Sequence, residues 1–166
     1  MRPDAPRIAR TAAALMLATA VSIPAAAPVM AQDFDADPTY GEFHLEPGFD
    51  PDPALLSVLA GGDVDAESKF EDCKGYVSAA PDVRLFWDGE STSGLTIKIS
   101  AMSNADTTLV VNGPDGTWYC DDDSGEDSNP SVELKPTGGR YEIWIGTYSE
   151  GELKKAVLGI SEVTSF

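Results

Sequence analysis

Hydrophobic and polar positions alternate along much of the chain after residue 76. Val83, Leu85 and Trp87 are each separated by one residue. Residues 95–101 alternate leucine, isoleucine and alanine with threonine, lysine and serine, which is the clearest such pattern in the sequence. A period of two places successive side chains on opposite faces of a β-strand. These two segments are therefore predicted to be strands with one face buried.

Further strands are predicted over residues 107–112, 117–120, 132–134, 141–145 and 156–163, with a turn at 113–116. Strands thus recur about every 10 to 15 residues, and Gly, Pro, Asn or Asp stand between them. This spacing predicts an all-β, antiparallel β-sandwich of jelly-roll-like type with about 7–9 strands. The predicted core consists of Leu85, Trp87, Leu95, Ile97, Ile99, Leu109, Val111, Tyr141, Ile143, Ile145 and Leu158.

The first 31 residues have the three parts of a secretory signal peptide. Three arginines lie within the first ten residues, an uncharged run follows from residue 11 to 32, and Val29-Met30-Ala31 offers a small-x-small cleavage pattern. The alternative is a retained membrane anchor, but Pro24 and Pro28 interrupt the run, and a span needs about 20 apolar residues. We expect cleavage after Ala31 and export to the periplasm or the medium, with no membrane span left afterwards.

The remaining 135 residues are enough for one domain. Residues 32–66 form a segment rich in proline and acidic residues, with one or two short strands expected near 43–45 and 55–60. Residues 66–74 are expected to form a helical turn or a loop. The sandwich itself is predicted to span residues 67–166.

Charge excludes one class of partner. The leader holds three of the 11 basic residues and one of the 28 acidic ones, so the exported chain has 8 basic and 27 acidic residues and a net charge of −19. Such a surface repels nucleic acids and anionic membranes. Binding of cationic partners or of divalent cations remains compatible with this charge. An alternative is that the acidity serves solubility alone.

Two cysteines, Cys73 and Cys120, remain after the leader. An even pair in an exported protein predicts a disulfide. Two free thiols or half of a metal site are the alternatives, and a single histidine disfavours zinc.

The second half resembles the bacterial pre-peptidase C-terminal domain. The resemblance lies in residues 106–123, in Asn129-Pro130 and in residues 139–148, which match that family's Asp-Thr strand, Pro-Asp-Gly-type hairpin, Asp-Asp loop and Gly-x-Tyr strand. It covers about residues 76–163. It implies a β-sandwich of the kind usually appended to secreted peptidases, which binds polymers or neighbouring domains. Because no peptidase precedes it here, it implies a free-standing relative, often labelled a peptidase by inheritance.

Catalysis finds little support in the sequence. A serine-peptidase triad needs a histidine base beside a nucleophile, and the one histidine, His44, lies in the proline-rich segment without a nucleophile motif. Glycosidases need two carboxylates close together, but with 27 acidic residues such pairs are inevitable and do not indicate a glycosidase. We predict a non-catalytic protein, and a secreted hydrolase related to serine peptidases is the alternative.

An acidic loop at residues 121–127 is the sharpest local feature. Clustered carboxylates suit Ca²⁺, which takes six to eight oxygen ligands, although the spacing is not that of an EF-hand. No cofactor is required for the fold, and Ca²⁺ is the candidate ligand; a solvated turn is the alternative. The candidate ligands are Asp106, Asp115, Asp121, Asp122, Asp123 and Asp127.

Three aromatic residues, Trp118, Trp144 and Tyr148, are the candidate binding surface together with the acidic loop. Tryptophan can form a platform for sugars, but in a sandwich it more often packs in the core. The predicted function is therefore an accessory domain that binds an envelope protein or an extracellular polysaccharide. A purely structural, soluble protein is a further alternative.

Overall fold

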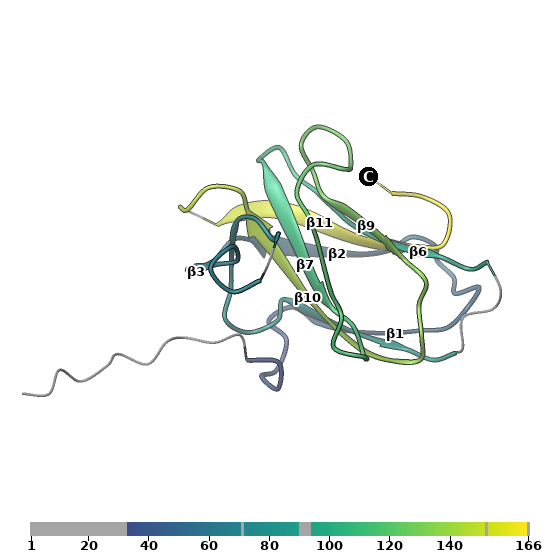
Figure 1. Ribbon diagram of the computed structural model, residues 1–166. Helices are drawn as coiled ribbons and strands as arrows, with labels where there is room; N and C mark the ends of the chain where they lie inside the picture. The colour runs from purple at the N-terminus through teal and green to yellow at the C-terminus, as the bar shows by residue number, and fades with distance from the viewer. Residues whose placement is uncertain (1–32, 71, 90–93, 152, 166) are drawn as a thin grey trace, which may run out of the picture.

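The computed structural model describes residues 33–165 except 71, 90–93 and 152. The described chain is folded into strands, turns and loops. The strands and their residue ranges are β1 Gly41–Leu45, β2 Ala54–Ala60, β3 Val64–Asp65, β4 Tyr76–Val77, β5 Val83–Trp87, β6 Ile97–Met102, β7 Thr107–Asn112, β8 Trp118–Asp121, β9 Ser131–Leu134, β10 Gly139–Thr147 and β11 Lys154–Ser161. They form two stacked sheets (Figure 1).

Sheet A has seven strands and is built around β10. Along one side β10 pairs with β5 and then with the short β4, which in turn pairs with β3; along the other side it pairs with β7, which pairs with β8. All these pairs are antiparallel, whereas β1 at the edge pairs with β5 in parallel. The nine residues of β10 can serve so many neighbours because this is the longest strand.

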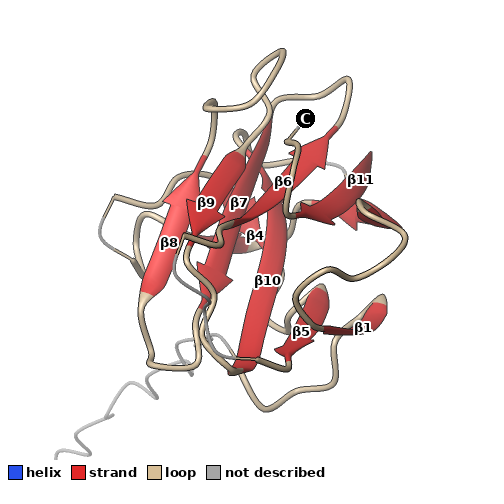
Figure 2. Cartoon of the chain, turned by 90° about the vertical axis from the view of Figure 1, so that its right-hand side faces the viewer, coloured by secondary structure: helices blue, strands red, loops and turns tan. Residues whose placement is uncertain are grey.

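Sheet B has four strands in the order β2-β11-β6-β9, all antiparallel. Its strands run across those of sheet A, as the turned view shows for β6 and β11 in front of β7 and β10 (Figure 2). Strand β2 forms one edge of sheet B and β9 the other.

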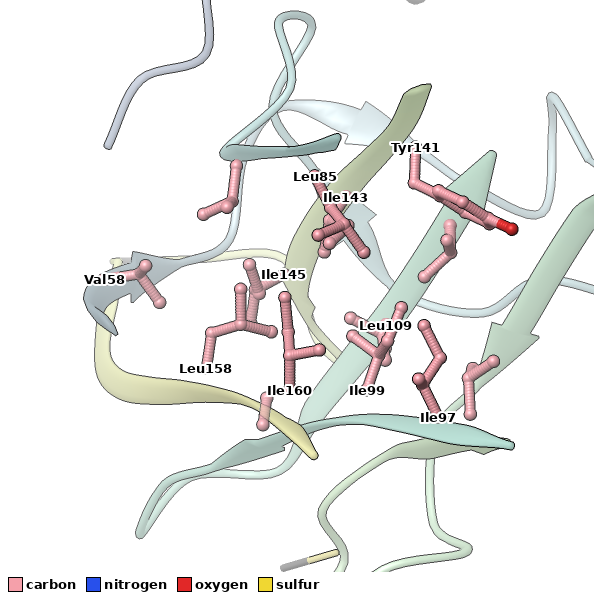
Figure 3. Close-up of a cluster of buried hydrophobic side chains, with 14 of the residues drawn as sticks. Val58, Leu85, Ile97, Ile99, Leu109, Tyr141, Ile143, Ile145, Leu158 and Ile160 are labelled. Atoms are coloured by element: carbon pink, nitrogen blue, oxygen red, sulfur yellow. The ribbon is translucent and has the colours of Figure 1, made fainter. Parts of the chain in front are cut away.

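The main core lies between the two sheets (Figure 3). Alternate residues of each central strand point into it, for example Leu85 from β5, Ile99 from β6 and Leu158 from β11, all with 0% exposure. Every predicted core residue belongs to this cluster and is buried, apart from Leu95, which is partly buried against it. The all-β prediction is therefore confirmed, and the period-two argument located the inner faces correctly.

The sandwich begins earlier than predicted. Strands β1 and β2 lie within residues 32–66, yet they are integral members of sheets A and B. The prolines that precede β2, Pro51 and Pro53, made this segment resemble a loop in the sequence, but they stand outside the strand and cost it no hydrogen bond. Residues 66–70 form a hydrogen-bonded turn, and the two-residue strands β3 and β4 were too short to predict.

The predicted signal peptide lies outside the described residues. In the part of the chain that the structure describes, no helix has the length and apolar character of a membrane span.

Candidate binding site

The disulfide between Cys73 and Cys120 is present, with 5.2 Å between the two Cα atoms. It fixes the segment before β4 to β8, on the outer face of sheet A. There it helps to enclose a second, smaller core that includes Val110 and Trp144 with 0% exposure. The outward side chains of β7 and β10 are thus buried as well as the inward ones.

Aromatic rings complete this second core. The ring of Phe70 lies 4.0 Å from that of Trp118, and Phe34 from the N-terminal segment lies 5.4 Å from Trp118 and 6.1 Å from Trp144, measured between centroids. The prediction that Trp144 offers a binding surface is wrong, because Phe34 and the disulfide-linked segment cover its ring. Trp118 is half-buried in the same cluster, and Tyr148 is exposed beyond the end of β10.

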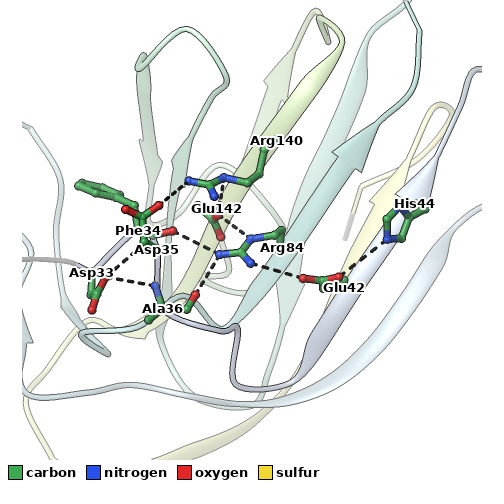
Figure 4. A network of polar contacts seen from close by, with 9 residues as sticks. All are labelled: Asp33, Phe34, Asp35, Ala36, Glu42, His44, Arg84, Arg140 and Glu142. Atoms are coloured by element: carbon green, nitrogen blue, oxygen red, sulfur yellow. Dashed lines mark hydrogen bonds and ion pairs between the residues drawn. The ribbon is translucent and has the colours of Figure 1, made fainter.

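Beside the aromatic cluster, a polar network holds the N-terminal segment on sheet A (Figure 4). The guanidinium of Arg84 donates from Nε to Glu142 Oε1 at 2.7 Å and from Nη2 to the carbonyl oxygen of Ala36 at 2.9 Å. Arg140 Nε lies 3.0 Å from the same carboxylate oxygen of Glu142. Burial raises the pKa of the Glu142 carboxyl, and the two guanidiniums oppose this effect. The network holds residues 33–37 against sheet A, and this segment covers part of the outer face of that sheet.

The outer face of sheet B is different, because large apolar side chains on it are exposed. Leu55 and Leu59 of β2 are 52% and 39% exposed, and Met102 of β6 is 48% exposed. Across the sheet, Ser57, Val157 and Met102 stand in one row of the register. A groove of about 730 Å³ crosses this face.

The groove has an apolar floor and a polar rim. Leu59, Val157 and Met102 contribute to the floor, while Lys155 and Glu126 lie on the rim. Exposed apolar patches with polar borders are typical of interaction sites. This groove is the candidate binding site, and sequence reasoning missed it because a period of two does not reveal which outward face stays uncovered.

One wall of the groove is held by Asn129, which is 3% exposed. Its Oδ1 accepts hydrogen bonds from Thr107 Oγ1 at 2.8 Å and from the Ser103 amide at 3.0 Å, and its Nδ2 donates to the Glu126 carbonyl at 2.9 Å. The side chain therefore ties the acidic loop to the β6–β7 connection. These hydrogen bonds fix the position of the rim.

Not all of the acidic residues proposed for calcium lie together. Asp115 lies in the β7–β8 turn, where its Oδ1 accepts from the Thr117 amide at 2.9 Å, and Asp121 lies at the other end of β8. Asp121 Oδ2 accepts from the amides of Ser124 at 3.0 Å and Ser131 at 2.8 Å. Within the described residues, no three such side chains are grouped as a metal site.

Of the other acidic residues proposed for calcium, Asp106, Asp122 and Asp123 lie near enough to interact through their charges. Burial, followed by the charges of Asp123, Asp121 and Asp106, raises the pKa of Asp122. Asp127 has a positive φ of 52° and lines the groove. Calcium binding stays a prediction that the structure does not test.

His44 lies exposed on β1. Its ring stacks on Phe86 with 4.7 Å between centroids, and its Nε2 is 3.8 Å from Glu42 Oε2. Neither neighbour is a nucleophile, and a triad needs one within hydrogen-bond reach. These are the contacts of a surface histidine.

One buried carboxyl lies at the end of the sandwich. Asp82 is 2% exposed, and burial raises its pKa to about 7. Its Oδ2 accepts from the Ile145 amide at 2.7 Å, and its Oδ1 accepts from Ser78 Oγ at 3.3 Å. Along β10, pairing with β5 ends at Ile143 and pairing with β4 begins at Thr147. The carboxyl bridges this gap, so its first role is structural.

A scan against models of protein families and a search of curated proteins find no match to this chain. Among solved structures, it is similar to the pre-peptidase C-terminal domain of a collagenase from Bacillus anthracis, with 10% identity, a TM-score of 0.43, and coverage of 72% of this chain and 94% of that chain.

It is also similar to PliG of Aeromonas hydrophila, a periplasmic lysozyme inhibitor of g-type lysozyme, with 15% identity, a TM-score of 0.40, and coverage of 76% and 98%. The first of these two structures is a domain of the family that the sequence motifs resemble. At these TM-scores, neither the residues nor the role of either protein is transferred to this chain.

Proposed function

We infer that this chain is an exported, non-catalytic accessory protein that binds another protein through the outer face of sheet B. The groove with its exposed Leu59 and Met102 is the observation that carries this proposal. Export is supported by the leader pattern and by the disulfide, since disulfides persist in oxidising compartments.

The chemistry of the groove favours a protein over a polysaccharide. Sugars are commonly held on exposed flat aromatic rings, but Trp144 is buried and Trp118 is half-covered by Phe34 and Phe70. The groove instead offers aliphatic and thioether side chains, which suit the apolar side chains of a protein partner. Lys155 and Glu126 on the rim provide charges of both signs for orientation.

A capture experiment with envelope proteins of the exporting cell tests the proposal. The wild-type protein is compared with Met102→Glu, which places a charge on the floor of the groove. Because a charge buried without a partner is costly, this variant is expected to retain at most about a tenth of the captured partner. Met102 is half-exposed, so its substitution should leave the melting temperature nearly unchanged.

Tyr148→Ala is the matched control, because Tyr148 is equally exposed, at 47%, but lies outside the groove. It is expected to capture the partner as well as the wild type. Loss of capture in Tyr148→Ala with retention in Met102→Glu would assign binding to the other surface. Cleavage of the captured protein by the wild type would contradict the non-catalytic role.

A further inference from the structure

Strand β2 is a long sheet edge that contains no charged residue and no proline. Of the described strands, β11 alone pairs with it. Natural edge strands are commonly short or carry charges, prolines or bulges that prevent pairing with other chains. The seven residues Ala54–Ala60 contain neither a charge nor a proline. By contrast, the parallel edge β1 carries Glu42 and His44.

The sequence of β2 is self-complementary. Read outward from Ser57, the residues on its two sides match in type and size, namely Leu56 with Val58, Leu55 with Leu59 and Ala54 with Ala60. Antiparallel pairing of two such strands about a two-fold axis at Ser57 places each residue opposite its counterpart. A two-fold interface requires this property, because the same patch must fit itself.

We propose that two copies of this chain associate through β2, in antiparallel register centred on Ser57, to form one continuous eight-stranded sheet. The exposed Leu55 of each copy then lies opposite the exposed Leu59 of the other on the outer face. The half-buried Leu56 lies opposite Val58 on the inner face. Each Leu55–Leu59 pair loses part of its solvent exposure, because directly opposed side chains of paired strands contact each other.

The backbone of this edge already has one competing contact, at the Leu59 end. The hydroxyl of Tyr40 reaches the carbonyl oxygen of Leu59 from beside sheet A, at 3.3 Å. This carbonyl therefore accepts a bond from outside sheet B, and a strand amide of a second copy can replace that long contact. Such replacement is the chemistry of β-strand addition.

Size and charge predict a weak, salt-dependent dimer. One strand per copy falls at the low end of specific interfaces, below about 1,200 Å² in total, so we expect a Kd on the order of micromolar. Each full-length chain carries a net charge of −17, and the two copies repel, whereas the contact itself is uncharged. Raising NaCl screens this repulsion, because the Debye length is about 10 Å at 0.1 M and about 3 Å at 1 M. Association should strengthen with salt.

Sedimentation velocity of the protein purified from cells that express the full-length sequence provides the first test. The wild type is expected to shift from monomer to dimer between about 1 and 500 µM, with the shift at lower concentration in 0.5 M NaCl. Ser57→Glu places like charges directly opposite each other and is expected to weaken the dimer at least tenfold, roughly the effect of 1.4 kcal/mol. Thr117→Glu adds the same charge at an exposed hairpin on sheet A and should leave association unchanged.

Mixing Ser57→Glu with Ser57→Lys tests the register. Only a two-fold axis at this residue places the two side chains opposite each other, so the mixture should regain dimer that neither variant forms alone. Cross-linking gives an independent readout, since both cysteines of the wild type are in a disulfide. Ser57→Cys should form a covalent dimer under mild oxidation, whereas Leu55→Cys, which lies opposite Leu59, should not.

Three results would overturn the proposal. The first is a monomer at all concentrations and salt levels. The second is a dimer that Ser57→Glu leaves intact or that the mixed variants fail to restore. The third is protection of the β2 amides from hydrogen exchange only when another protein is present, which would assign this edge to a different partner. Although Ser57 also lines the groove, sedimentation and cross-linking measure the oligomeric state of the protein alone, whereas capture of a partner measures the groove, so the dimer and the binding function can fail separately.

Discussion

Asp82 makes the stability of this fold depend on pH in an unusual direction. Burial raises the pKa of its carboxyl from the ordinary 3.8 to about 7. The folded protein therefore binds a proton between these values that the unfolded chain has released. The contribution of this carboxyl to the free energy of unfolding is fully present below about pH 4 and is lost as the pH rises through about 7. Most carboxyls of folded proteins act in the opposite direction.

The shift of about three pKa units corresponds to about 4 kcal/mol at most, at 1.36 kcal/mol per unit. Asp82→Asn removes the charge but keeps an oxygen to accept from the Ile145 amide. Its amide group can donate to Ser78 Oγ, which itself donates to the Ala80 carbonyl at 2.7 Å. We expect this variant to gain stability relative to the wild type, by up to about 4 kcal/mol, as the pH rises from 4 to 8.

Urea unfolding at intervals between pH 4 and pH 8 measures this difference. The comparison of variant with wild type removes the contributions of the other acidic residues, which both proteins share. Asp63→Asn is the control for the loss of one carboxylate, because Asp63 is exposed and lines the same pocket as Asp82. Parallel profiles for Asp82→Asn and the wild type would show that the Asp82 carboxyl does not titrate differently in the folded state, and the reasoning from burial would fail.

Two further predictions concern the disulfide and calcium. Replacing Cys73 and Cys120 together by serine opens a loop with a sequence separation of 47 and should cost about 4 kcal/mol in urea unfolding, and a loss below about 1 kcal/mol would contradict the chain-entropy account. The predicted calcium site implies that millimolar CaCl₂ raises the melting temperature more than NaCl of equal ionic strength does, and an equal temperature in both would refute it. A rise of several degrees with CaCl₂ alone, reversed by EDTA, would establish a calcium site.

The inner faces of the strands could be predicted from the sequence, but the cover on the outer face of sheet A could not. In β10, Glu142 and Trp144 stand at the positions that alternate with core residues, and both are buried. They are covered by Phe34 and Arg84, about 110 and 60 residues away along the chain. A period of two tells which side chains point inward, and it carries no information on what lies above the opposite face.

The acidic loop shows a second limit. A carboxylate that organises its own turn and one that binds a metal ion are the same residue type in the same kind of sequence. Asp121 joins the start of its loop to β9 by accepting from the Ser131 amide, ten positions ahead. This contact depends on the arrangement of β8 and β9, which the spacing of acidic residues does not reveal. The self-complementary pattern around Ser57 was visible in the sequence, but only the topology places it at an edge.

The groove on sheet B and the proposed dimer contact at β2 together have a consequence for partner binding. In an antiparallel pair, residues directly opposite each other point to the same face. Two copies joined at β2 therefore carry their grooves on one side of the continuous sheet, and a partner with two suitable sites can engage both. Linked binding raises apparent affinity by 10²-fold or more when the geometry allows both contacts. Leu55→Glu places a charge in the β2 contact at a residue that does not line the groove. It should then abolish this gain while each groove keeps its single-site affinity, whereas Met102→Glu should weaken both. A partner that binds wild type and Leu55→Glu equally tightly would show that the grooves act one at a time.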